Sequence, residues 1–241
     1  MRIVALGDTH GRVIWKEIVA KEKDADKIVF IGDYFDTHHA GVSGNKQLVN
    51  FKEIVAFKRA NPDQVVLLFG NHDYHYLRGM ASRGEVYSGY QAGYAHDFLE
   101  AIEDALKDDS VQMCWVHDKY VFSHAGFTKT WCDRVLGNDD VRGEQLQTAV
   151  NDMFKFQPLN FGFMMGDNYS QSGNDKTQGP IWVRPQSLVP DMVDDIVCVV
   201  GHTTVKEMGI TEMYNIILID CLGTSGQYLV IEDGKPRAEN L

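Results

Sequence analysis

Short apolar runs that end at a tight turn and a polar residue recur along this chain, and they constrain its fold more than any other feature. Five such runs stand out, at 3–6, 27–31, 65–69, 120–122 and 196–200. Each is rich in β-branched residues and lacks strict alternation, which is typical of strands buried on both faces. Helix-like stretches lie between them, at 13–23, 44–59 and 90–106. This alternation of strand and helix predicts an α/β fold.

The remainder of the chain is less regular. Residues 214–220 and 227–231 look like a pair of strands that closes a sheet. Residues 127–178 combine a helical segment, 144–156, with a stretch rich in Gly, Asn, Asp and Ser, 166–178. We interpret 127–178 as a variable insertion over one face, and we expect a single domain, 1–241, because this length suits one large α/β domain.

Composition excludes several classes of protein. Hydrophobic residues make up 44% and charged residues 24%, as in globular proteins, so the whole chain is neither disordered nor a coiled coil. Thirty-four acidic against 23 basic residues give a net charge of -11, which disfavours binding to long nucleic acid or to an anionic membrane. The N-terminal apolar run has only a strand's length, so neither a signal peptide nor a membrane span is expected. Four scattered cysteines without a CxxC motif indicate a reducing, cytoplasmic location.

The residues that follow the five strands carry the chemistry. They are almost all carboxylates, imidazoles and amides: Asp8 and His10, Asp33 and Asp36, Asn71 and His72, His124, and His202. Ligands of α/β folds bind at the carboxyl ends of strands, so these groups are expected to meet. One such turn would be ordinary, but five in one chain predict a metal site. Oxygen and nitrogen donors without thiolate favour Mn, Fe, Zn, Co or Ni, and their number suggests two ions that clamp a phosphoryl group.

These motifs resemble those of the calcineurin-like metallophosphoesterase superfamily. The matching segments are Gly7-Asp8-Thr9-His10-Gly11, Gly32-Asp33-Tyr34-Phe35-Asp36, Gly70-Asn71-His72-Asp73, His124, and Gly201-His202-Thr203. The form Gly-Asp-x-His-Gly looks most like the bacterial and phage serine/threonine phosphoprotein phosphatases, and the related diadenosine tetraphosphate hydrolases. The resemblance implies a four-layer α-β-β-α sandwich, in which 127–178 forms a helical and loop insertion over the active-site face.

The resemblance also implies a cofactor of two divalent metal ions, with Mn expected first and Fe, Zn, Co or Ni as alternatives. Asp33 would bridge the ions, and the other ligands would divide between them, with Asp8 and His10 on the first ion, and Asn71, His124 and His202 on the second. A hydroxide that bridges the ions would attack phosphorus. His72, oriented by Asp36, would act as the general acid that protonates the leaving oxygen.

The chain departs from the phosphatase pattern where substrate is usually held. Thr37-His38 replace the usual Arg-Gly, Asp73 replaces Glu, and Ala125-Gly126 replace Gly-Gly. The missing arginine normally binds the substrate phosphate. Arg184, in a Trp-x-Arg segment similar to that of bacterial members, is a candidate replacement and would act with Asn71. A surface arginine beside a core tryptophan explains Arg184 equally well.

Other polar and aromatic residues receive structural interpretations. His38 and His39 are expected to be loop residues more than substrate contacts, and His75, His96 and His117 are expected to be structural. A group of tyrosines follows the third motif and could stack a nucleobase, although packing is the expected role: Tyr74, Tyr76, Tyr87, Tyr90 and Tyr94.

The leading hypothesis is a dinuclear, metal-dependent phosphomonoesterase of protein phosphatase type, whose partner is a phosphorylated substrate. The alternative is a nucleotide-directed hydrolase acting on a dinucleoside polyphosphate or a cyclic phosphodiester. Two further classes are a non-catalytic binding protein, which the complete ligand set disfavours, and a nuclease, which the acidic net charge disfavours.

Overall fold

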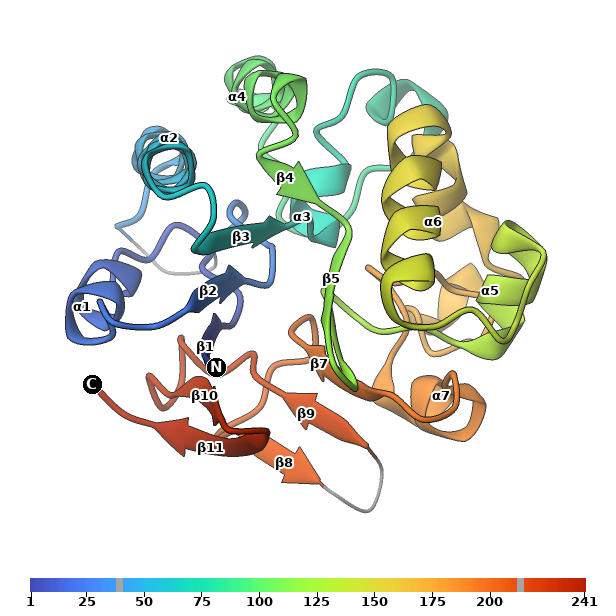
Figure 1. Ribbon diagram of the computed structural model, residues 1–241. Helices are drawn as coiled ribbons and strands as arrows, with labels where there is room; N and C mark the ends of the chain where they lie inside the picture. Colours follow the sequence, from blue (N-terminus) through green and yellow to red (C-terminus); the bar gives the residue numbers. More distant parts are fainter. Residues whose placement is uncertain (38–40, 212–214) are drawn as a thin grey trace.

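Two β-sheets lie at the centre of the computed structural model, which describes residues 1–37, 41–211 and 215–241 (Figure 1). Sheet A has the strand order β11-β10-β1-β2-β3-β4, and sheet B has the order β5-β6-β7-β9-β8. The strands of sheet A are β1 (Arg2–Leu6), β2 (Lys27–Phe30), β3 (Val65–Leu68), β4 (Val111–Gln112), β10 (Tyr228–Glu232) and β11 (Lys235–Glu239). Those of sheet B are β5 (Cys114–His117), β6 (Tyr120–Ser123), β7 (Val197–Val200), β8 (Gly209–Thr211) and β9 (Ile216–Leu218).

The facing sides of the two sheets form one core, and their outer sides pack against helices. In β1, Ile3 and Ala5 point between the sheets, whereas Val4 and Leu6 point to the helical side. This is the period-two alternation of a strand, here with both faces apolar because both faces are covered. The helices are α1 (Trp15–Lys21), α2 (Gly44–Ala60), α3 (Asn71–Tyr74), α4 (Ala95–Lys107), α5 (Lys129–Leu136), α6 (Gly143–Phe156) and α7 (Pro185–Leu188).

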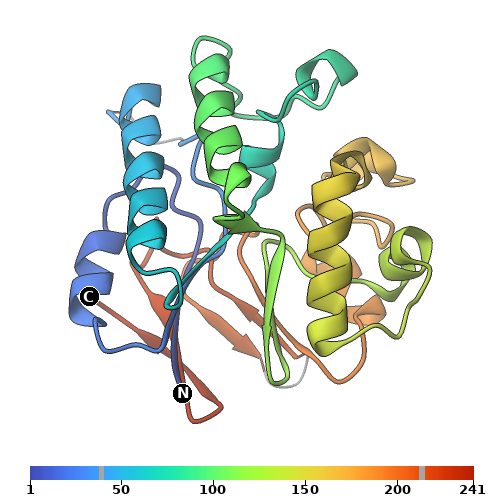
Figure 2. The same cartoon turned by 45° about the horizontal axis from the view of Figure 1, so that its top comes forward.

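The helices complete a four-layer α-β-β-α sandwich, which confirms the predicted fold class. Helices α1, α2 and α4 pack on the outer side of sheet A, and α6, with α5 beside it, covers sheet B (Figures 1 and 2). The segment 127–178 therefore supplies both helices over sheet B. This segment continues into the 3-10 turns η2 (Pro158–Phe161), η3 (Phe163–Met165) and η4 (Tyr169–Gln171). The 3-10 turns η1 (Ala81–Arg83) and η5 (Val189–Asp191) lie outside it.

The predicted pairing of 214–220 with 227–231 is wrong. Strand β9 lies between β7 and β8 in sheet B, whereas β10 pairs with β1 and β11 in sheet A. The chain crosses from one sheet to the other between these strands. The hairpin joins β10 to β11 instead, where Asp233 and Gly234 adopt positive φ angles of 50° and 73°, as a tight two-residue turn requires.

The helix expected at 90–106 begins later, at Ala95. Tyr90 lies in an irregular segment and Tyr94 in a turn before it. The helices expected at 13–23, 44–59 and 144–156 are present, and the first is shorter at both ends.

Parallel strands bring the predicted site residues to one edge of the sandwich. Strands β1, β2 and β3 run parallel in sheet A, and β6, β7 and β9 run parallel in sheet B. Their carboxyl ends carry the candidate ligands. Across the described ranges, no helix has the length and apolar character needed to cross a bilayer.

Candidate metal centre and active site

The side chains predicted at the strand ends meet in one cluster. Asp33 Oδ2 lies 3.3 Å from His124 Nε2 and 3.8 Å from His10 Nε2. Asn71 Oδ1 lies 2.8 Å from both His124 Nε2 and His202 Nδ1. Donor atoms from both sheets therefore converge on one place, as the strand-end pattern predicts.

Asp8 completes the cluster at its buried side. Ligand atoms of Asp8, Asp33 and His124 all lie within 4.8 Å of one another, and none of the three side chains is more than 2% exposed. Asp8 also accepts a hydrogen bond from the peptide N–H of His202 at 3.0 Å. The Asp8 carboxylate, which follows β1 of sheet A, is thus held by the backbone of His202, which follows β7 of sheet B.

The three imidazoles are oriented by backbone carbonyls. Each carbonyl oxygen faces one ring nitrogen: Phe35 O faces His10 Nδ1 at 2.6 Å, Ile31 O faces His124 Nδ1 at 3.0 Å, and Trp182 O faces His202 Nε2 at 2.9 Å. A carbonyl oxygen can only accept, so we assign the proton to that nitrogen in each ring. The other nitrogen then carries its lone pair toward the cluster, which is the arrangement of a metal-binding histidine.

The donor set fits a divalent cation. In the neutral rings, the lone pairs of His124 and His202 both face Asn71 Oδ1, which is itself an acceptor. Acceptor atoms that converge at hydrogen-bond distance repel one another unless a proton or a metal cation lies among them, and, although burial would lower it, the carboxylates of Asp33 and Asp8 raise the pKa of His124 to about 9. Nitrogen and oxygen donors without thiolate match the ions expected from the sequence.

The pKa values of the two carboxylates of the cluster are shifted in opposite directions. Burial alone would raise the pKa of Asp33, but His124 and its neighbouring imidazoles hold it well below its usual range. Burial, together with the charge of Asp220, raises the pKa of Asp8 well above its usual range. A bound cation would favour the charged form of both carboxylates.

Local backbone geometry aims these side chains. Four site residues have positive φ, an uncommon conformation outside glycine: His10 at 44°, Asp33 at 52°, Asp36 at 61° and His202 at 60°. Two motif glycines let the chains approach closely, because a Cβ on Gly70 would overlap Asp33 and one on Gly201 would overlap Asp8. The tight turns of the motifs thus serve to place ligands, not merely to end strands.

Asp73 ties two of these turns together. Its carboxylate accepts hydrogen bonds from the peptide N–H groups of Asp33 at 2.9 Å, Tyr34 at 2.8 Å and Gly70 at 2.9 Å. Asp73 is fully buried. The shorter side chain that replaces the family's usual glutamate therefore clamps the backbone beside the cluster.

We expect Asp73→Asn to destabilise the fold by about 2–3 kcal/mol, because the amide nitrogen would face buried N–H groups that need an acceptor. Urea unfolding of the metal-free protein measures this change. Asp118→Asn, at a side chain that is 79% exposed, is the matched control and should change stability little. Equal stability of the two variants would show that the Asp73 clamp is unimportant.

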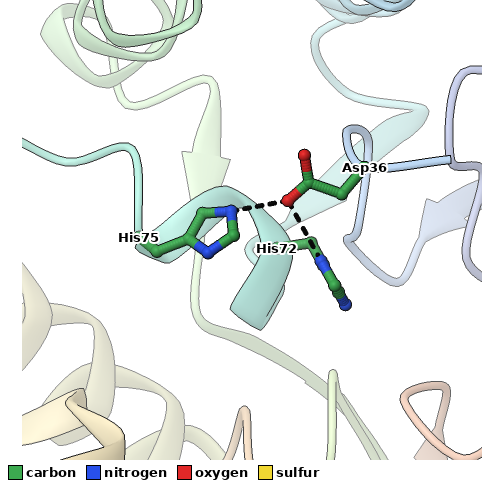
Figure 3. Close-up of side chains that lie close together, drawn as sticks. All are labelled: Asp36, His72 and His75. Carbon is green, nitrogen blue, oxygen red and sulfur yellow. Dashed lines mark hydrogen bonds and ion pairs between the residues drawn. The ribbon is translucent and has the colours of Figure 1, made fainter. Parts of the chain in front are cut away.

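His72 and Asp36 form a pair at the edge of the cluster. His72 Nδ1 donates to Asp36 Oδ2 at 3.1 Å (Figure 3). The His72 ring lies 5.3 Å from that of His10 between centroids. Burial would lower the pKa of His72, but the carboxylates of Asp33 and Asp36 raise it to about 9. The His72 side chain is 16% exposed and can reach solvent. The predicted partners are thus brought together, with an imidazole that favours its protonated form.

Arg184 lies beside His202 and not on the open surface. Its Nη1 donates to His202 O at 2.8 Å and to Thr203 Oγ1 at 3.2 Å, and its Nε donates to Ser172 O at 3.0 Å. Burial lowers the pKa of His202 well below its usual range, and the neighbouring Arg184 guanidinium adds to this effect. Trp182 is a buried core residue.

Sequence reasoning missed several residues that shape the site. Asp220 is buried, follows β9, and accepts from Thr204 Oγ1 at 2.7 Å. Its position after an apolar run is the same signal that identified the other strand ends. His75 was expected to be structural, yet its Nε2 donates to Asp36 at 2.6 Å. No local signal marks Gln91, which reaches Asp36 from a distant loop.

The remaining histidines and the tyrosines give a mixed outcome. His38 and His39 lie outside the described residues. His96 and His117 pair with Glu100 and Asp118 at the surface. The tyrosines pack as expected, with Tyr74 and Tyr76 buried and the others partly buried against the core: Tyr87, Tyr90 and Tyr94.

Comparison with known proteins identifies the family. The model of calcineurin-like phosphoesterases matches residues 1–206, which is most of the chain. The chain belongs to the calcineurin-like phosphoesterase family. It is therefore a metal-dependent phosphoester hydrolase, and the described residues include groups of carboxylates and imidazoles close enough to hold a metal ion.

Solved structures share the fold at low sequence identity. The cold-active protein-tyrosine phosphatase of a psychrophilic Shewanella species is 19% identical, with a TM-score of 0.64, over 98% of this chain and 77% of that chain. A mutant cold-active protein-tyrosine phosphatase is 21% identical, with a TM-score of 0.63 and the same coverage. A search of curated proteins gave no significant match.

Proposed function

We propose that this phosphoesterase is a phosphomonoesterase that acts on a phosphorylated protein, with His72 as its general acid. The observation that carries the proposal is the place of His72. A proton donor held by Asp36 lies next to His10, at the edge of the candidate metal cluster. An alkoxide leaves poorly unless it is protonated, so this position suits the departing oxygen of a phosphomonoester.

The proposed ligands are those expected from the sequence. Asp33 would be shared by two ions, with Asp8 and His10 on one, and Asn71, His124 and His202 on the other. When bound, the ions supply Lewis-acid activation of the phosphoryl group and of water near neutral pH. Mn is the proposed metal, and Fe, Zn, Co and Ni suit the same donors.

The chain's own residues would orient the substrate and move the proton. His72 Nδ1 is engaged by Asp36, which leaves Nε2 to donate to the leaving oxygen. Arg184 lies beside His202 of the cluster. Its Nε and Nη1 already bond backbone and threonine oxygens, so Nη2 would contact the phosphate, with Asn71 as a second candidate contact.

Four substrates in parallel test the proposal. Metal-stripped protein would be reloaded with Mn, Fe, Zn, Co or Ni and assayed on p-nitrophenyl phosphate, bis-p-nitrophenyl phosphate, phosphopeptides and diadenosine tetraphosphate. The phosphopeptides would carry phosphoserine or phosphotyrosine, since the Shewanella protein is named a tyrosine phosphatase. We expect turnover of the monoester and of a phosphopeptide, with the highest rate in Mn.

Faster turnover of the diester or of diadenosine tetraphosphate would overturn the proposed substrate class and support the nucleotide alternative. Binding of metal without turnover of any of the four would contradict the phosphomonoesterase proposal.

A further inference from the structure

Asp36 is held by more partners than its pairing with His72 requires. Its Oδ2 accepts hydrogen bonds from His75 Nε2 at 2.6 Å and from His72 Nδ1 at 3.1 Å (Figure 3). Its Oδ1 accepts from the Tyr76 hydroxyl at 2.5 Å and from Gln91 Nε2 at 3.0 Å. Four donors therefore fix both oxygens of one fully buried carboxylate.

The donors differ in their access to substrate. The side chains of His75 and Tyr76 are buried, whereas that of His72 is 16% exposed. Of these three side chains, only His72 is thus placed to meet a substrate. The two buried donors can affect the reaction only by holding the Asp36 carboxylate.

The backbone of Asp36 belongs to the same network. Gln47 Oε1 accepts from the Asp36 peptide N–H at 2.8 Å and from Gln91 Nε2 at 3.0 Å. Asp36 itself has a positive φ of 61°, a conformation that persists where surrounding contacts fix it. The network therefore sets both the backbone and the carboxylate of this residue.

His75 contributes one hydrogen bond to this network and leaves its other ring nitrogen unsatisfied. Its Nδ1 is buried and, within the described residues, has no hydrogen-bond partner. The ring lies among aromatic side chains, 4.4 Å from Tyr76 and 5.1 Å from Tyr90 between centroids. A phenylalanine would fill this aromatic site without leaving a polar atom unsatisfied. The one bond that distinguishes histidine here is the Nε2–H bond to Asp36.

We propose that His75 is a positioning residue, whose Nε2–H bond holds the Asp36 carboxylate so that His72 stays aimed at the leaving oxygen. The inference rests on the proposed role of His72 as general acid. Asp36, His72 and His75 are also close enough to be a metal-binding group, so the test includes metal content.

The test compares three variants on phenyl phosphate and p-nitrophenyl phosphate, in the fully metal-loaded enzyme. His75→Phe keeps the ring and removes the donor, and His75→Gln restores an N–H donor. We expect His75→Phe to lower kcat on phenyl phosphate about tenfold with KM unchanged, and to affect p-nitrophenyl phosphate much less. His75→Gln should recover most of the loss. Tyr90→Phe, whose hydroxyl is not among the four donors to Asp36, should behave like the wild type.

A variant at another donor to Asp36 keeps the test valid if His75→Phe misfolds. Tyr76→Phe removes another donor to Asp36 while it keeps its ring, and the same dependence on leaving group is expected. An equal loss on both substrates, without recovery in His75→Gln, would show a merely structural role and overturn the inference. Loss of bound metal in His75→Phe would overturn it in favour of a metal ligand.

The outcome for His72 separates failure of this inference from failure of the proposed function. If His72→Asn depends on the leaving group and His75→Phe does not, only the inference is wrong. If neither variant depends on the leaving group, the assignment of His72 as general acid is itself wrong.

Discussion

Asp33→Asn is expected to abolish turnover and to lower the metal content of the purified protein. Asp33 Oδ2 is the atom that approaches both His124 and His10, so its charge would serve both of the proposed ions. Changes to residues that merely support a metal ligand cost about 10–100-fold in affinity or activity, so loss of the shared ligand should exceed about 100-fold. Plasma mass spectrometry of the dialysed protein measures the metal, and p-nitrophenyl phosphate measures turnover.

The substitution conserves shape, which makes its interpretation direct. The amide oxygen can still accept from the His72 peptide N–H, which donates to Asp33 Oδ1 at 2.9 Å, so the turn should persist. Asp118→Asn removes the same charge at an exposed site and should keep full metal and turnover. Two ions per chain and wild-type turnover in Asp33→Asn would refute the role of Asp33 as the shared ligand.

The convergence of these side chains could be predicted from the sequence because its signal is local. A short buried strand followed by a turn and a polar side chain identifies one ligand position, as at Asp8 and Asp33. Parallel strands then bring such positions to one edge, whatever the details of packing. The structure brings the six side chains into one cluster, and their role as metal ligands stays a proposal: Asp8, His10, Asp33, Asn71, His124 and His202.

The residues that support the cluster through Asp36 could not be predicted in the same way. Gln91 reaches Asp36 across 55 positions of sequence, from a turn before α4. Nothing in its neighbourhood marks it, because its role depends on where α2 and α4 pack. His75 looked structural for the same reason, since the residue that it serves belongs to another strand end.

The error at the C-terminus has a related cause. Strands β9 and β10 are both apolar and close in sequence, so a pair of strands in one sheet is the simplest interpretation. In a two-sheet sandwich, however, each strand can complete either sheet. The choice is made by distant neighbours, with β10 pairing with β1 at the other end of the chain.

His72→Asn is expected to lower kcat by about 100- to 10,000-fold on a substrate whose leaving group is an alkyl alcohol, such as phosphoserine. The asparagine cannot supply the proton that the alkoxide needs, although metal binding through the adjacent Asn71 should persist. The loss on p-nitrophenyl phosphate should be far smaller, because nitrophenolate leaves without much protonation. Steady-state kinetics on a series of leaving groups measures this dependence as the slope of log kcat against leaving-group pKa.

The slope distinguishes a proton donor from a residue that only binds phosphate. Loss of a phosphate contact would raise KM or lower kcat by the same factor for every substrate, and the slope would stay that of the wild type. Loss of the acid makes the slope steeper, because the developing charge on the leaving oxygen is no longer neutralised. His96→Asn, at a side chain that is 80% exposed, is the matched control and should leave the slope unchanged. An unchanged slope in His72→Asn would assign the general acid to another group.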